Sequence, residues 1–187
     1  MRLPTAVGPV TAYAQTMRDV EVLGVRLQLP SNAPVVLLRD PSSHEVLPLW
    51  VGSAEAAAIA FGLQGIHPDR PLTHDLMLSL IRTGSDVREL VITELRDSVF
   101  LAVLVLADGT EVDCRPSDGI AVAVRCQAPV RVAEEVWAEA AMSAADEDEV
   151  SEEVDVEQFR AFLDTVSPED FDNPGSGTTP SPSGEPS

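Results

Sequence analysis

Three short stretches of the sequence combine reactive polar side chains with a turn that leads into a predicted helix. The residues in these stretches that could take part in chemistry are Glu55, His74, Asp75, Arg115, Ser117 and Asp118. The first turn of a helix presents free backbone N–H groups, which bind anions. A carboxylate there also stabilises the helix by about 0.3–1 kcal/mol without any catalytic role, so a structural role stays open at each acidic position.

The residue types in these stretches suit the chemistry of phosphodiesters. Glu55, Asp75 and Asp118 carry the carboxylate oxygens that hard divalent cations such as Mg²⁺ or Mn²⁺ prefer as ligands. A metal held by these three residues would polarise a phosphodiester and activate water. The same carboxylates suit general-base catalysis, His74 suits metal ligation or proton transfer, and Arg115 suits binding of a phosphate group.

The elements that must position these residues do not alternate one for one along the chain. Apolar and β-branched runs predict strands, and stretches that begin at capping residues predict helices. The expected strands are 18–29, 35–38, 46–51, 87–95, 99–106, 110–115 and 130–132, and the expected helices are 53–63, 74–82, 117–125 and 134–142, with Ser53, Thr73 and Ser117 as N-caps. This order favours an α+β fold, with a mixed or antiparallel sheet and three to four helices.

One of the expected helices is unusual because residues 56–63 are apolar almost all round. A helix of this kind is buried on several sides of its own domain or lies in an oligomer interface. Both roles are open, and we expect a homo-oligomer that forms through residues 56–63.

The charge of the chain is divided unevenly. The 187 residues include 12 arginines, no lysine and 31 acidic residues, for a net charge of -19. Residues 1–140 carry 11 arginines and 18 acids, a net of -7, whereas residues 141–187 carry 1 arginine and 13 acids, a net of -12. We expect a flexible arm over 1–17, the folded domain over 18–142, an acidic linker with a short amphipathic helix over 143–172, and a disordered tail over 173–187.

The composition also argues against several classes of partner and location. The sequence shows neither a basic footprint for nucleic-acid phosphates nor a polybasic helix for a membrane surface. No apolar run approaches the roughly 20 residues that a membrane span requires. Residues 1–16 lack the apolar core of a secretory signal, and the only cysteines are Cys114 and Cys126. We therefore expect a cytoplasmic protein that does not contact membranes.

Four runs of the sequence resemble the hallmark motifs of the bifunctional nuclease family. They are LPLWVGSAEAAAIA at 47–60, RPLTHDL at 70–76, CRPSDGIA at 114–121 and PVRVAEEV at 129–136, in family order and at family spacing. The resemblance covers about residues 18–140 and implies a compact α+β domain with activity on DNA and RNA. Residues 159–171 resemble the C-terminal extension of actinobacterial-type members. The motif positions that match are Glu55, His74, Asp75, Arg115, Ser117 and Asp118. Among them we expect Glu55, His74, Asp75 and Asp118 to be catalytic and Arg115 and Ser117 to bind the substrate.

Two hypotheses from different classes follow. In the first, the protein is a nuclease that hydrolyses phosphodiester bonds of DNA or RNA with the help of a divalent metal. In the second, it is a non-catalytic, oligomeric binding or regulatory module whose acidic tail binds a basic protein partner. The first hypothesis predicts that Glu55, His74, Asp75, Arg115 and Asp118 converge on one cleft.

Overall fold

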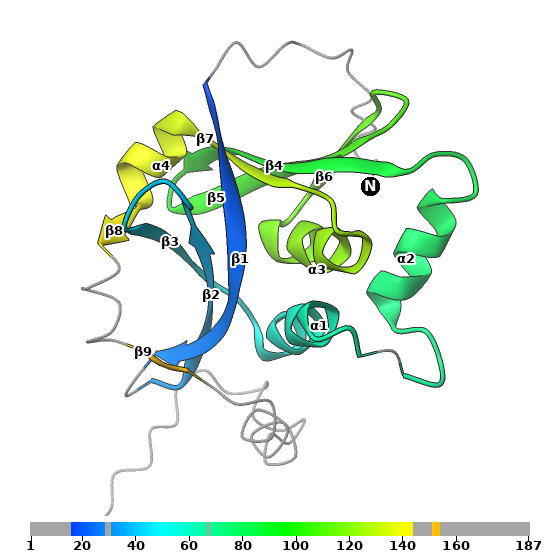
Figure 1. Cartoon of the computed structure of the whole chain (residues 1–187), viewed down its shortest axis with the longest axis horizontal. Coiled ribbons are helices and arrows are strands. Elements are labelled where there is room, and N and C mark those ends of the chain that lie inside the picture. The colour runs from blue at the N-terminus through cyan, green and yellow to red at the C-terminus, as the bar shows by residue number, and fades with distance from the viewer. Residues whose placement is uncertain (1–15, 29–30, 67, 144–150, 154–187) are drawn as a thin grey trace, which may run out of the picture. The chain divides into compact units, whose positions relative to one another are not determined.

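The computed structural model describes residues 16–28, 31–66 and 68–143 and the backbone of 151–153 (Figure 1). The chain divides into two units, residues 1–154 and 155–187, and all described elements belong to the first. The strands are β1 Met17–Gln28, β2 Ala33–Arg39, β3 Glu45–Trp50, β4 Val87–Arg96, β5 Val99–Leu106, β6 Glu111–Cys114, β7 Val130–Ala133, β8 Met142–Ser143 and β9 Ser151–Glu153. The helices are α1 Ser53–Leu63, α2 Thr73–Ile81, α3 Pro116–Cys126 and α4 Glu134–Ala140.

These elements confirm the predicted α+β class, and each expected strand and helix has a counterpart. The short strands β8 and β9 were not expected. Each is defined by its pairing with a distant strand, β8 with β3 and β9 with β1, and such non-local pairing leaves no local signal in the sequence. The predicted arm, amphipathic helix and tail lie almost entirely outside the described residues.

The strands form one mixed sheet in the order β6-β5-β4-β7-β1-β2-β3-β8, and β9 pairs with β1. Only the β4–β7 pair is parallel among the described strands. The long strand β1 joins the two halves of the sheet, because residues 17–20 pair with β7 and residues 21–28 pair with β2. A register shift between Val22 and Gly24 accompanies this change of partner, and Gly24 adopts a φ of 156°, which glycine tolerates without strain.

Helix α3 packs against β4 and β5, and α1 and α2 pack against α3 (Figure 1). The core between the helices and the sheet contains the largest fully buried side chains, which include Leu38, Leu47, Ile59, Leu90, Ile92 and Ile120. Residues 56–59 of α1 are buried, and Ala58 and Ile59 belong to this core. Of the two roles expected for this helix, the structure therefore shows burial within the domain, and the homo-oligomer stays a prediction.

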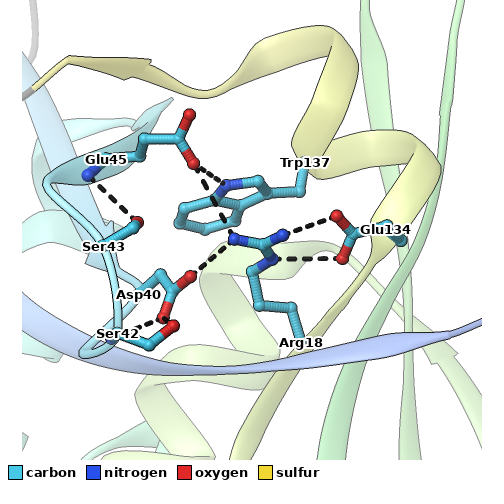
Figure 2. A network of polar contacts seen from close by, with 7 residues as sticks. All are labelled: Arg18, Asp40, Ser42, Ser43, Glu45, Glu134 and Trp137. Atoms are coloured by element: carbon cyan, nitrogen blue, oxygen red, sulfur yellow. Dashed lines mark hydrogen bonds and ion pairs between the residues drawn. The ribbon is translucent and has the colours of Figure 1, made fainter.

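A network of polar contacts centres on Arg18 in β1 (Figure 2). Its guanidinium donates to Glu134 through Nη2 and Nε, at 2.5 and 3.1 Å, and to Asp40 Oδ2 at 2.5 Å. The guanidinium carbon lies 5.2 Å from the ring centre of Trp137, whose indole nitrogen donates to Glu45 at 2.9 Å. Arg18 thus links β1, the β2–β3 turn and α4.

None of the helices described is long and apolar enough to cross a membrane.

Candidate active site

The starts of α1, α2 and α3 each place an acidic residue at the third helical position. The N-cap residues are Gly52, Leu72 and Arg115 rather than the predicted Ser53, Thr73 and Ser117. Ser53 and Thr73 stand at the first position of their helices and Ser117 at the second, so Glu55, Asp75 and Asp118 each stand third in their helix. A carboxylate at this position can reach back to the backbone of the N-cap residue.

Arg115 connects the first and third of these carboxylates. Its Nη2 lies 2.9 Å from Glu55 Oε1, and its Nε and Nη2 lie 2.7 and 3.0 Å from the two oxygens of Asp118. These bonds hold the pKa of Asp118 below its ordinary range, because the Arg115 guanidinium favours the ionised carboxylate. They raise the pKa of Arg115 in turn, so the group is a permanent cation.

His74 extends this group from the second position of α2. Its Nε2 lies 3.4 Å from Asp118 Oδ1, and its side chain is buried. Asp118 therefore contacts both the guanidinium of Arg115 and the imidazole of His74. A carboxylate that contacts an imidazole in this way fixes the orientation of the ring, as in hydrolases that use histidine for proton transfer.

A pocket of about 440 Å³ opens beside these four residues. It is lined by Glu55, His74, Arg115 and Asp118 and by apolar residues of α1 and α2. Its volume lies in the range of small-molecule and substrate sites. Arg115 is the only arginine among the described residues that line this pocket, and its side chain is 65% exposed. The first turns of three helices thus bring an acid, an imidazole and an exposed cation to one opening.

Asp75 does not join this group. Its Oδ2 accepts from the backbone N–H of Leu72 at 2.9 Å, and its Oδ1 accepts from Arg125 Nε at 2.8 Å. Arg125 is 5% exposed and also donates to the carbonyl oxygens of Ala58 and Ala121, at 2.8 and 2.7 Å. One buried arginine therefore ties α1, α2 and α3 together. Asp75 and Arg125 hold the helices in place and line a different hollow, of about 640 Å³.

Two further residues near the start of α3 do not present a reactive group to the pocket. Ser117 is buried at the second position of α3 and is absent from the described lining of the pocket. Cys114 precedes the helix, and burial raises the pKa of its thiol to about 11. A thiol with this pKa is protonated at neutral pH and is a poor nucleophile.

The predicted metal set of Glu55, Asp75 and Asp118 does not come together at one point. Asp75 is bound to Arg125, while the other two carboxylates are bound to Arg115. Within the described ranges, no group of three or more His, Cys, Asp or Glu side chains is arranged to hold a metal ion. The residues do not fit the predicted metal site, and we derive no catalytic step through a metal.

Comparison with known proteins assigns the family. The model of the bifunctional nuclease domain matches residues 36–145, and the chain therefore belongs to this family. It is similar to an uncharacterized protein of Mycobacterium tuberculosis, with 43% identity over 161 residues that cover 83% of this chain and 98% of that protein. It is also 30% identical to Bifunctional nuclease 2 of Oryza sativa subsp. japonica and 28% identical to Bifunctional nuclease 2 of Arabidopsis thaliana. Each of these two matches covers 56% of this chain and 35% of the plant protein.

The sequence analysis missed Arg125 as the residue that ties the helices together. One signal was present, because Arg125 follows the apolar run 120–124 inside an expected helix, where a charge must find partners. It also missed the apolar lining of the pocket by Phe61 and Met77. These residues follow ordinary core-like patterns, and only the packing of α1 and α2 against α3 shows that they face an opening.

Proposed function

We propose that the protein hydrolyses phosphodiester bonds of DNA or RNA in the pocket between the first turns of α1, α2 and α3. One observation carries the proposal. Arg115 is held between Glu55 and Asp118 in the lining of this pocket, and His74 contacts the same carboxylate of Asp118. Membership of the bifunctional nuclease domain family, and the names of the plant relatives, support the same activity.

Hydrolysis of a phosphodiester requires a base, an acid and a positive charge at the phosphoryl oxygens. Glu55 takes a proton from the attacking water, whose oxygen forms the new bond to phosphorus. His74 donates a proton to the leaving oxygen as the old phosphorus–oxygen bond breaks. Arg115 stabilises the charge that develops on the phosphoryl group, and Asp118 orients Arg115 and His74.

The hydrogen bonds of Arg115 leave a donor group that can bind a phosphate, although the protein as a whole is acidic. A guanidinium has five N–H donors, and the bonds described to Glu55 and Asp118 use Nε and Nη2. Within the part of the chain that the structure describes, Nη1 has no bonding partner, and we assign it to a phosphate oxygen. Because residues 1–140 carry a net charge of -7, the protein should bind nucleic acid through this local contact rather than through a broad basic surface.

The experiment is a cleavage assay on fluorescent DNA and RNA oligonucleotides. We expect Glu55→Gln and His74→Ala to lower kcat about 100-fold or more, the effect of losing a general base or acid. Glu94→Gln is the matched control, because Glu94 is also paired with an arginine, Arg96, but lies in β4. Equal activity in the wild type and all three variants would overturn the proposal. Runs with EDTA, Mg²⁺ and Mn²⁺ test the metal dependence expected from the sequence.

Gly52, which lies next to Glu55, offers a further variant that replaces no charged residue. A Cβ built on Gly52 would overlap Glu55 Oε2, the far end of a flexible side chain. The backbone of Gly52 has φ -72° and ψ 160°, which alanine adopts without strain. We expect Gly52→Ala to move the Glu55 carboxylate, to lower kcat about tenfold and to leave the midpoint of urea unfolding nearly unchanged. An unchanged kcat would show that the position of Glu55 is not important.

Three finer expectations stay predictions. They are the homo-oligomer, the basic protein partner of the acidic tail, and the cytoplasmic location. Analytical ultracentrifugation of the full chain tests the first, and a pull-down with and without residues 143–187 tests the second. Neither result changes the assignment of the pocket.

A further inference from the structure

The lining of the pocket combines charged residues with a larger number of apolar ones. Six apolar residues line it, four from α1, one from α2 and one at the N-cap of α2: Ala54, Ala57, Ala58, Phe61, Met77 and Leu72. The four residues of α1 follow the spacing i, i+3, i+4 and i+7, which places them on one face of the helix. Three of the four are alanines, whose small side chains leave space between α1 and α2.

This pocket, which we call the slot, has a charged group and an aromatic ring at different heights along α1. Glu55 stands in the first turn beside Arg115, and Phe61 stands six residues later. At a rise of 1.5 Å per residue, the two positions are about 9 Å apart along the helix axis. A ligand that fills the slot must therefore carry its charge at one end and a flat or apolar group at the other.

We propose that the slot binds one unpaired nucleobase, so that the preferred substrate is single-stranded nucleic acid. This inference rests on the proposed function. A nucleotide has the required order, with a phosphate for Arg115 and a base for the apolar faces of Phe61 and Met77. Aromatic and thioether groups are favourable contacts for a base π-face.

A base-paired duplex cannot fill the slot in the same way. Its bases are stacked between their neighbours, and a base enters a protein pocket only after it is unstacked and unpaired, at a cost of a few kcal/mol. A single strand presents unstacked bases without this cost. The slot volume of about 440 Å³ suits one nucleotide rather than a helical segment.

The first test measures binding without cleavage. We expect a nucleoside 5′-monophosphate to bind at least about tenfold more tightly than ribose 5-phosphate or inorganic phosphate in isothermal titration calorimetry, because base–aromatic contacts favour binding by this order. The second test compares kcat/KM for one oligonucleotide, single-stranded and annealed to its complement. We expect the single strand to be preferred by about tenfold or more.

One variant fills the slot without changing a charge. Ala54 is exposed at the second position of α1, where leucine is a good helix former. We expect Ala54→Leu to remove the tighter binding of the nucleoside monophosphate and to raise KM for the single strand. Leu80→Ala is the control, since Leu80 is exposed on α2 and absent from the described lining of the pocket.

The outcomes separate this inference from the proposed function. Cleavage of single and double strands at equal kcat/KM, with no tighter binding of the nucleoside monophosphate, would overturn the slot and leave the nuclease proposal standing. Specific binding that Ala54→Leu removes, in a protein that cleaves no nucleic acid, would support the slot and overturn the nuclease proposal. Equal effects of Ala54→Leu and Leu80→Ala would also contradict the slot.

Discussion

Arg18 and Arg115 make similar bonds in different surroundings. Each arginine holds carboxylates from separate parts of the chain, at distances of 2.5–3.1 Å. The Arg18 side chain is 25% exposed, lies against the Trp137 ring and binds Asp40, which is almost fully buried (Figure 2). The Arg115 side chain is 65% exposed and lines a pocket. The same ion-pair chemistry therefore joins elements of the fold in one place and faces a ligand space in the other.

This difference shows which observation points to function. The residue types alone do not separate the two arginines, since acidic partners surround both of them. What separates them is access to solvent. A permanent cation that keeps a donor group at an open pocket can bind an anion, whereas an arginine that lies against an indole ring and binds two carboxylates is already satisfied. The next three substitutions test this distinction.

The largest effect is expected from Arg115→Met. Loss of the guanidinium removes the charge that stabilises the phosphoryl group, and kcat/KM should fall about 100-fold, or about 2.7 kcal/mol. Stability should fall by about 1 kcal/mol, less than in Arg18→Met, because Glu55 and Asp118 are 20% and 25% exposed and stay partly hydrated without the guanidinium. Arg96→Met is the control, since Arg96 is equally exposed and paired with Glu94. A similar loss of activity in both variants would remove the special role of Arg115.

Arg18→Met should lower the stability of the protein and leave its activity unchanged. It leaves the Asp40 carboxylate, which is only 4% exposed, without its cationic partner. We expect a loss of about 2 kcal/mol in the free energy of unfolding, measured by urea denaturation. The kcat per folded molecule should stay at the wild-type value. A fall in kcat with unchanged stability would mean that the Arg18 network takes part in the reaction.

We expect Asp40→Asn to cause the smallest effect of the three, a loss of stability that depends on pH. The Ser42 hydroxyl and backbone N–H, followed by Arg18, hold the pKa of Asp40 below its ordinary range. A lowered pKa stabilises the fold above the unfolded pKa of about 3.9, and this contribution is lost as the pH falls through the folded value. The variant should be about 1 kcal/mol less stable at pH 7, and the difference should shrink below about pH 4. A difference that stays constant from pH 7 to pH 3 would contradict this assignment.

Much of the fold follows from local sequence patterns, because its strands and helices are defined by short runs. The apolar run 99–106 and the Asp108–Gly109 turn lead to the β5–β6 hairpin, where Gly109 takes a φ of 84°. Helix starts were harder, since Ser53 and Thr73 look like N-caps but stand at the first helical position. In α2, Asp75 accepts the backbone bond at the N-cap instead.

The candidate site could be predicted only as a set of positions. The sequence placed Glu55, Asp75 and Asp118 in the first turns of their helices. It could not show which of these carboxylates lie close to one another. That depends on how the helices pack, and in the structure Asp75 meets Arg125 while the other two meet Arg115. The partner of an ion pair 50 residues away leaves no local pattern, as Arg125 shows.

The most direct test of the central claim is a titration followed by NMR. A short single-stranded oligonucleotide with phosphorothioate linkages, which resists cleavage, is added to the isotope-labelled full chain while backbone amide signals are recorded. We predict that the largest shifts fall in the first turns of α1, α2 and α3, at residues 53–57, 73–77 and 115–119, and that Arg115→Met abolishes them. Shifts centred on Arg18 and α4, or shifts at the first turns that persist in Arg115→Met, would contradict the assignment of this pocket as the nuclease site.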